Sequence, residues 1–250
     1  MAPSPAILVS GLRKLYGDKA AVAGVDLEVP RGSFFGFLGP NGAGKSTTIR
    51  ILTGLIPADA GSIEILGFRL PKDELEIKRR IGLVPDESLL FDRLTGPEFL
   101  EFAGRMYGLD RPTARVRAAR LLDLFEVQAG RKLIGEYSKG MRKRVAMAAS
   151  LIHHPELFLM DEPFEGVDAV GARLMKDILL DQVARGATIF LTSHVLEVVE
   201  RLCDRVAIIH NGKIVVSGAM AELRCGGESL EDAFVRVVGA ARQGEPLDWL

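Results

Sequence analysis

The 250-residue sequence has little cysteine, almost no net charge and no long apolar run. Its two cysteines, Cys203 and Cys225, lie outside any Cys-x-x-Cys pattern, which excludes a disulfide scaffold and gives no metal or redox signal. Since 32 Lys and Arg residues face 33 Asp and Glu residues, the net charge of -1 gives no bulk reason to expect nucleic acid as a partner. No apolar run approaches the roughly 20 residues of a membrane-spanning helix, and the first residues lack the pattern of a secretory signal. These absences predict a chain that works in the cytoplasm.

The composition that remains is typical of a globular protein with a substantial core, at 48% hydrophobic and 26% charged residues. Short β-branched and apolar runs alternate with helical periodicity, which predicts an α/β fold with a mostly parallel sheet. The expected strands are residues 6–10, 25–29, 33–38, 62–66, 81–84, 156–160, 188–192, 205–210 and 213–216. The expected helices are residues 45–53, 97–106, 112–125, 139–151, 170–183 and 195–202.

The order of these elements predicts one domain rather than two in tandem. The chain is rich in strands up to about residue 84, almost wholly helical over about 87–152, and rich in strands again after 156. This order indicates a helical subdomain inserted into an α/β core. The basic clusters at 115–120 and 139–144 are interpreted as solvated helix faces rather than contacts with nucleic acid. Residues 240–250 are interpreted as a frayed tail.

A phosphate-binding loop is the most specific motif in the chain. Residues 39–46 read Gly-Pro-Asn-Gly-Ala-Gly-Lys-Ser and match G-x-x-x-x-G-K-[ST], between an apolar strand and a helix. The glycines let successive backbone N–H groups turn toward phosphate oxygens, and the helix that follows adds the positive end of its dipole. The lysine would reach the terminal phosphates, and the serine hydroxyl would bind Mg²⁺. The residues of this expected site are Gly39, Pro40, Asn41, Gly42, Ala43, Gly44, Lys45, Ser46 and Thr47.

Two acidic residues follow a second apolar strand. Asp161 and Glu162 come directly after Leu157-Phe158-Leu159-Met160. A carboxylate at the end of a buried strand is well placed to hold the Mg²⁺ of a neighbouring phosphate site, and a second one beside it would polarise the attacking water. Alone, the pattern also fits a solvated loop; next to a phosphate loop it predicts a hydrolytic site.

A third feature of the same kind begins the helix expected at 139–151. Ser138 in Tyr137-Ser138-Lys139-Gly140-Met141 is a good N-cap, which by itself explains the sequence. The same geometry also makes an anion site. A second anion site about a hundred residues from the first is hard to explain within one nucleotide pocket.

In this order and spacing, the motifs resemble those of the nucleotide-binding subunit of an ATP-binding cassette (ABC) transporter. The resemblance covers nearly the whole chain, from Tyr16 to about Gly239. It implies a P-loop NTPase core with a mostly parallel sheet, an N-terminal antiparallel β part and an inserted helical subdomain. It also implies a single ATPase domain over residues 1–239, followed by the tail.

The resemblance implies a role for each motif. Tyr16 would stack on adenine with Ala21 nearby, residues 39–47 would form the Walker A loop, and Asp161 and Glu162 would be the Walker B aspartate and the catalytic glutamate. The segment with Ser138 and Gly140 would cap the γ-phosphate bound on a partner subunit, and residues 165–168 would link the two sites. His194 would contact the γ-phosphate. Without the ordered set of motifs, Tyr16 fits a core or surface tyrosine better than an adenine-binding residue. His194 alone fits a residue without a ligand as well as it fits a phosphate contact.

Three positions depart from the family pattern. Asp86 follows Pro85 where glutamine is usual, and its shorter acidic side chain is expected to serve Mg²⁺, through water or directly. Lys139 and Met141 stand where glycine and glutamine are commoner. This form of the motif resembles cassettes of the exporter branch, whose membrane subunits are separate chains, as does the stretch at 230–234.

The resemblance implies an ATPase that uses ATP and Mg²⁺ and drives export by a separate membrane permease. It further implies a second nucleotide-binding subunit, expected to be a copy of this chain, and a place on the inner face of the cell membrane through the permease. The apolar residues within 86–108 are expected either to line a groove for that partner or to join the insertion to the core. The alternatives are a soluble ABC-type ATPase not coupled to transport and a small-molecule kinase, which would leave Tyr137–Met141 and His194 without a role.

Overall fold

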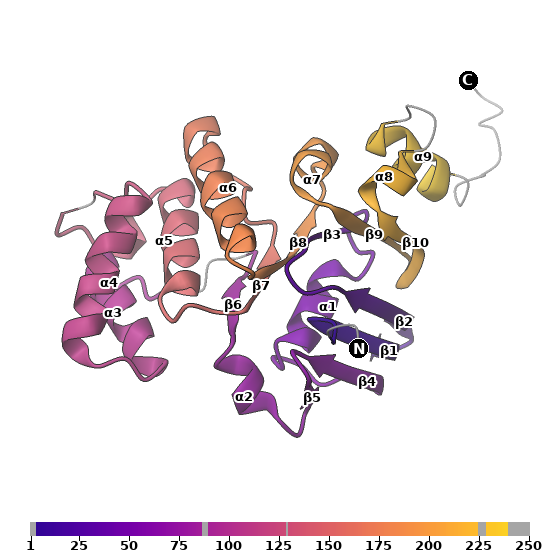
Figure 1. The fold of residues 1–250 in the computed structure, drawn as a ribbon, viewed down its shortest axis with the longest axis horizontal. Helices are drawn as coiled ribbons and strands as arrows, with labels where there is room; N and C mark the ends of the chain where they lie inside the picture. The colour runs from indigo at the N-terminus through magenta and orange to yellow at the C-terminus, as the bar shows by residue number, and fades with distance from the viewer. Residues whose placement is uncertain (1–3, 87–89, 129, 225–228, 240–250) are drawn as a thin grey trace.

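Two β-sheets and a group of helices make up the structure (Figure 1). The computed structural model describes residues 4–86, 90–128, 130–224 and 229–239. The tail at 240–250, Cys225 and residues 87–89 lie outside the described residues. The α/β class with a mostly parallel sheet, an N-terminal antiparallel sheet and a helical subdomain is confirmed.

The N-terminal sheet has four antiparallel strands in the order β2-β1-β4-β5. They are β1 (Ile7–Tyr16), β2 (Lys19–Val29), β4 (Ala60–Ile65) and β5 (Phe68–Leu70). β1 and β2 are longer than their apolar runs predict. The outer half of β1 buries only Leu12, and its pairing with β2 shifts register after Val9, so this half carries no alternating pattern.

The second sheet has six strands in the order β10-β9-β3-β8-β7-β6, and only the β9–β10 pair is antiparallel. The strands are β3 (Phe34–Leu38), β6 (Ile81–Val84), β7 (Leu157–Asp161), β8 (Thr188–Ser193), β9 (Arg205–His210) and β10 (Lys213–Ala219). β3, β7 and β8 are buried along their whole length, as expected for parallel strands covered on both faces. The predicted hairpin at Asn211-Gly212 joins β9 to β10.

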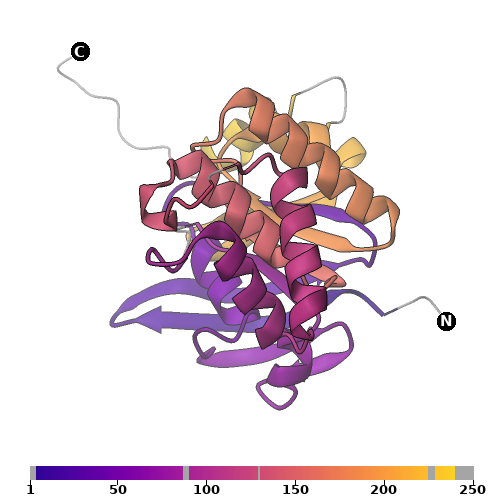
Figure 2. The same cartoon turned by 90° about the vertical axis from the view of Figure 1, so that its left-hand side faces the viewer.

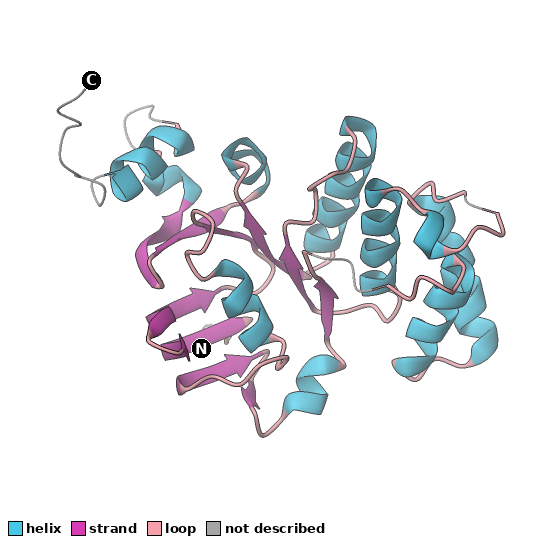
Figure 3. Ribbon diagram, turned by 180° about the vertical axis from the view of Figure 1, so that it is seen from behind, coloured by secondary structure: helices cyan, strands magenta, loops and turns pink. Residues whose placement is uncertain are grey.

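Separate apolar clusters cover the two faces of this sheet. α1 (Lys45–Leu52) and the antiparallel sheet pack on the face that carries Phe35 and Phe37. α5 (Lys139–Leu151), α6 (Ala169–Ala184) and α7 (Leu196–Leu202) pack on the face that carries Phe34 and Leu38 (Figure 3). Because side chains alternate along β3, one short strand contributes to both clusters.

The helical subdomain consists of α3 (Gly96–Met106), α4 (Arg111–Leu124), the short 3₁₀ helix η1 (Ile134–Glu136) and α5 (Figure 2). Each long helix begins with a capping side chain: Thr95, Asp110 and Ser138 accept hydrogen bonds from Glu98 N, Thr113 N and Met141 N. These caps explain why the predicted helices begin within a residue of the observed ones.

The sequence does not predict β5, α2 (Glu74–Lys78) or α8 (Met220–Leu223), because each has too few residues to show a period. The ten-residue helix α9 (Leu230–Gly239) is also absent from the predicted helices. In the part of the chain that the structure describes, no helix combines the length and the apolar character needed to cross a bilayer.

Candidate nucleotide-binding site

The site lies where four neighbouring parallel strands end. β3, β8, β7 and β6 are adjacent in the sheet and run in the same direction, so their carboxyl ends meet at one edge. The segments that leave these ends are the phosphate loop after β3, His194 after β8, Glu162 after β7 and Asp86 after β6. Residues up to 155 positions apart in the chain, Gly39 and His194, therefore follow neighbouring strands.

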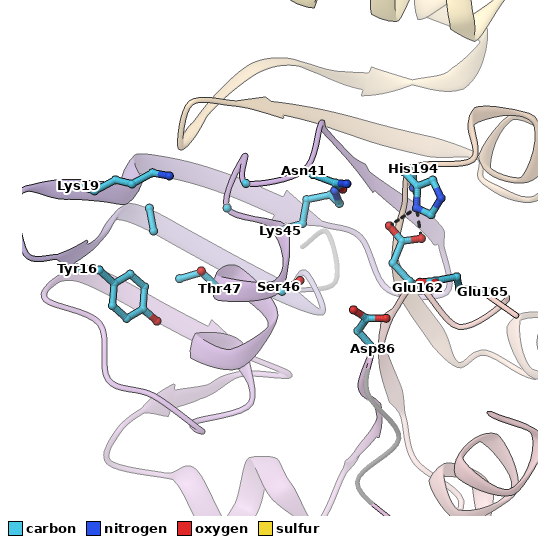
Figure 4. Close-up of a pocket in the computed structure, with 13 residues that line it drawn as sticks. Tyr16, Lys19, Asn41, Lys45, Ser46, Thr47, Asp86, Glu162, Glu165 and His194 are labelled. Carbon is cyan, nitrogen blue, oxygen red and sulfur yellow. Dashed lines mark hydrogen bonds and ion pairs between the residues drawn. The ribbon is translucent and has the colours of Figure 1, made fainter. Parts of the chain in front are cut away.

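A cavity of about 680 Å³ opens at this edge (Figure 4). Its volume is within the usual range for ligand pockets, about 300–1,000 Å³. Tyr16 stands at one end of the cavity, and Glu162 and His194 stand at the other, with the phosphate loop between them. The lining residues are Tyr16, Lys19, Ala21, Asn41, Gly42, Gly44, Lys45, Ser46, Thr47, Asp86, Glu162, Glu165 and His194.

Close packing fixes the backbone of the phosphate loop. Gly44 has φ +113°, and a Cβ there would lie 2.3 Å from the carbonyl oxygen of Ala21 on β2. A Cβ on Gly39 would lie 2.4 Å from the carbonyl oxygen of Ile209 on β9. Ala43 O also accepts a hydrogen bond from Gly212 N in the β9–β10 turn. Contact with a neighbouring strand therefore requires glycine at positions 39 and 44, and at position 44 the positive φ requires it as well.

Lys45 is held inside the loop. Its side chain is buried, and its Nζ donates hydrogen bonds to the carbonyl oxygens of Gly39 at 2.7 Å and Pro40 at 3.3 Å. Burial lowers the pKa of Lys45, and the negative charges of Glu162, Asp161 and Asp86 oppose that shift. Both acceptors are neutral, so the anionic oxygens of a phosphate would be stronger partners for this ammonium group.

Asp161 and Glu162 are adjacent in sequence but have different surroundings. Asp161 is buried at the end of β7, and its Oδ1 accepts a hydrogen bond from Thr192 Oγ1. Glu162 has φ +46°, a conformation rare for a residue with a side chain. Its Oε2 accepts a hydrogen bond from the backbone N of His194 at 3.3 Å, and its Oε1 lies 3.0 Å from His194 Nδ1. One carboxylate is fixed within the protein, and the other is turned into the cavity beside the histidine.

A second, smaller cavity of about 150 Å³ has Ser46 and Asp86 in common with the main one and is also lined by Asp161. These three residues offer hydroxyl and carboxylate oxygens, the ligands that a hard divalent cation prefers. Among the described residues, no three His, Cys, Asp or Glu side chains are grouped as a metal site. Mg²⁺ characteristically binds through one or two carboxylates together with water and substrate phosphates, so this donor set fits Mg²⁺ carried by a nucleotide.

The segment with Ser138 and Gly140 does not line the cavity of its own chain. Ser138 caps α5, and Lys139 Nζ lies 2.7 Å from Oε1 of Glu165. This contact lowers the pKa of Glu165 and raises that of Lys139. A Cβ on Gly140 would lie 3.2 Å from Gly166 O, so the segment rests against the loop at 165–168.

The structure adds two lining residues to those expected from sequence. Lys19 pairs with Tyr16 across the β1–β2 turn, and Glu165 follows Glu162 in the next loop. A lysine at the start of an exposed strand carries no sequence signal, whereas Glu165 belongs to the loop at 165–168 that the resemblance assigns to linking the two sites. Conversely, Gly39, Pro40, Ala43 and Asp161 do not line the main cavity; the first two provide the carbonyls that hold Lys45.

A strand, a phosphate loop and a helix at the carboxyl edge of a parallel sheet, with carboxylates on the neighbouring strand, define a P-loop nucleoside triphosphatase. The family model for the ABC transporter matches residues 22–165. The chain is 40% identical to the daunorubicin resistance ATP-binding protein DrrA3 of Streptomyces coeruleorubidus over 237 residues, which cover 94% of this chain and 75% of that protein. It is also 40% identical to the linearmycin resistance ATP-binding protein LnrL of Bacillus subtilis, over 92% of this chain and 75% of that protein.

Similarity extends to solved structures. One described as the structure of an ATP-binding subunit of an ABC transporter superposes with a TM-score of 0.86 at 32% identity, covering 92% of this chain and 98% of that one. The chain belongs to the ATP-binding subunits of ABC transporters and is an ATPase. The resemblance stated from the sequence is confirmed.

Proposed function

We propose that this chain is the ATP-hydrolysing subunit of an ABC exporter that works as a dimer with a separate membrane permease. The observation that carries the proposal is the meeting of four strand ends at one cavity, which brings together Lys45, Asp86, Glu162 and His194. DrrA3 and LnrL are both described as resistance ATP-binding proteins, which supports export as the direction of transport. Residues 1–239 would act as one ATPase domain.

The cavity would hold ATP along its length. Tyr16 would stack on the adenine with Ala21 beside it, because the ring is half-exposed at the end away from the carboxylates. The backbone of residues 39–47 and the Lys45 ammonium would hold the phosphates. Glu162 would accept a proton from the attacking water, and His194 would orient Glu162 and contact the γ-phosphate.

Ser46, Asp86 and Asp161 would hold the Mg²⁺ that accompanies the nucleotide. When bound, this ion neutralises negative charge on the phosphate oxygens. Asp161 is fixed for this task by Thr192, whereas Asp86 is half-exposed and would act directly or through water.

A second subunit, which we infer to be a copy of this chain, would complete the site. Ser138 and Gly140 lie outside the cavity of their own chain, at the N-terminal end of a 13-residue helix, where backbone N–H groups favour an anion. They would cap the γ-phosphate bound on the partner. Since Lys139 already contacts Glu165, movement at one site would reach the other.

The permease would bind at the helical subdomain. Phe91, Phe102, Met106 and Tyr107 are exposed there, whereas Phe99 and Leu100 are buried and join the subdomain to the core. The exposed residues of the stretch fit a groove for the partner, and the buried ones fit the join to the core, while Leu89 lies outside the described residues. Phe102 and Met106 also line a hollow of about 450 Å³ on α3. Binding there would place the subunit on the inner face of the cell membrane. We expect no nucleic acid among its partners.

The proposal is tested with Glu162→Gln, which keeps the shape of the side chain and removes the base. We expect ATP hydrolysis to fall by about 100-fold or more, since general-base catalysis contributes about 10²–10⁴-fold. ATP should still bind, and size-exclusion chromatography with ATP and Mg²⁺ should show a dimer. A monomer under these conditions would count against the shared site. Wild-type protein that never co-purifies with membranes would favour the soluble ABC-type ATPase instead.

A further inference from the structure

A buried lysine joins the helical subdomain to the nucleotide cavity. Lys143 lies on α5 with 1% of its side chain exposed. Its Nζ donates hydrogen bonds to the carbonyl oxygens of Pro85 at 3.1 Å and Asp86 at 2.6 Å. The same nitrogen lies 3.9 Å from Oδ1 of Asp86. These contacts hold the segment that leaves β6 and carries Asp86 into the cavity.

Packing alone does not explain a lysine at this position. A buried ammonium loses its hydration, and an apolar side chain of similar length would fill the same space at lower cost. Two backbone carbonyls satisfy part of the donor capacity of Lys143, and the positive charge faces a carboxylate. The arrangement therefore indicates that Lys143 has a function at residues 85–86, the segment that it holds.

That function concerns the metal edge of the cavity, which is the group of Ser46, Asp86 and Asp161. Asp86 and Asp161 share the smaller cavity with Ser46, and Glu162 follows directly. The charges of these carboxylates act on Lys45, which is held in the phosphate loop, where a nucleotide would engage it. Lys143 approaches Asp86 from α5, within the protein, and a bound phosphate would leave its contacts in place.

We propose that Lys143 is a positioning residue for ATP hydrolysis, which fixes the backbone of residues 85–86 and thereby the place of the Asp86 carboxylate beside Ser46 and Asp161. The inference rests on the proposed role of Asp86 toward Mg²⁺. Because α5 begins beside Ser138, Lys143 also ties the position of Asp86 to the segment that would meet the nucleotide of the partner.

The test measures how strongly Mg²⁺ improves nucleotide binding. In a Glu162→Gln background, which prevents turnover, the affinity for a fluorescent ATP analogue is measured with Mg²⁺ and with EDTA. We expect Lys143→Met to reduce the ratio of the two affinities about tenfold, as loss of an outer-shell partner typically does, with the EDTA affinity within about twofold. With Glu162 intact, kcat should fall about tenfold and KM should change less than about threefold.

Matched variants separate this role from general destabilisation. Arg117→Met also removes a bond from a helix cation to a backbone carbonyl, that of Ile152 at 2.8 Å, away from the cavity. It should leave the affinity ratio unchanged even if it lowers the thermal midpoint. Lys143→Gln keeps an N–H donor without the charge; it serves if Lys143→Met fails to fold, and it should reduce the ratio by at least about threefold.

A double-mutant cycle with Asp86→Asn tests whether Lys143 acts through Asp86. If Lys143 positions the Asp86 carboxylate, Lys143→Met should change the ratio at least about fivefold less in the Asp86→Asn background, a coupling of about 1 kcal/mol. Additive effects, or an unchanged ratio in Lys143→Met, would overturn the inference. An unchanged ratio in Asp86→Asn alone would instead show that the proposed role of Asp86 is wrong.

Discussion

The contact between Gly44 and β2 allows a sharp test of how the phosphate loop is held. Gly42 and Gly44 both have positive φ, +78° and +113°, but their surroundings differ. A Cβ on Gly42 would meet nothing within 4 Å, whereas one on Gly44 would lie 2.3 Å from Ala21 O and 3.4 Å from Ile209 Cδ1. Alanine at the two positions therefore separates backbone strain from collision.

The expected magnitudes follow from these two terms. Gly42→Ala should lower the free energy of unfolding by about 1–2 kcal/mol, the usual penalty for a left-handed alanine. Gly44→Ala should lower it by about 2–6 kcal/mol, since backbone strain and the displacement of a packed strand each contribute about 1–3 kcal/mol. Both values are measured by urea unfolding without nucleotide, where phosphate contacts play no part.

Nucleotide binding gives the second measurement. Gly44→Ala should also weaken ATP binding by at least about tenfold, because a loop displaced from β2 no longer directs its N–H groups at the phosphates. Equal losses of unfolding free energy in the two variants would refute the reasoning, since they would mean that contact with Ala21 does not hold the loop. Full ATP affinity in Gly44→Ala would refute it as well.

Two further predictions concern the helical subdomain. Met106 on α3 is 71% exposed, and Met106→Glu should release the subunit from membranes without changing its ATP affinity. Leu75→Glu, at a residue 63% exposed on α2, is the control and should stay bound. If Met106→Glu also stays bound to membranes, the proposed docking surface is wrong. His153 stacks on Tyr107 with ring centroids 3.5 Å apart, and burial lowers the pKa of His153 to about 4. Because the pKa of His153 in the folded protein lies below its usual value of about 6.5, the stability that neutral His153 contributes is present above pH 6.5 and is lost as the pH falls toward 4. Over that range, the free energy of unfolding of the wild type should therefore fall by about 1–3 kcal/mol more than that of His153→Gln. Equal losses in the two proteins would show that His153 does not carry this pH dependence.

The sequence predicts the centre of the site better than its margins. Gly39 follows the buried strand β3, and Asp161 and Glu162 stand at the end of the buried strand β7; such strands show in the sequence as apolar runs. Lys45 is predicted by the phosphate-loop motif itself. The boundaries of α5 were predicted to the residue because Ser138 marks its start. These features are local, so a single sequence displays them.

Features that depend on contacts between distant segments could not be predicted. The outer half of β1 is a strand because β2 and β4 pair with it, although its own residues are mostly exposed. The basic cluster at 139–144 is predicted to be a solvated face, and this prediction is wrong for Lys143, which is buried against Pro85 and Asp86. Only the packing of α5 on β6 reveals that Lys143 faces inward.

If Glu162 is the base, as proposed above, its left-handed backbone sets the stability of the fold against activity at a single residue. A side chain at φ +46° is strained by about 1 kcal/mol or more, and glycine would relieve that strain. Glu162→Gly should therefore unfold at a higher temperature than Glu162→Gln, although neither could supply the base. Selection for thermostability alone would favour glycine at position 162, which would stabilise the fold and remove the proposed base. A library sorted only for folded protein should thus enrich inactive chains at this position.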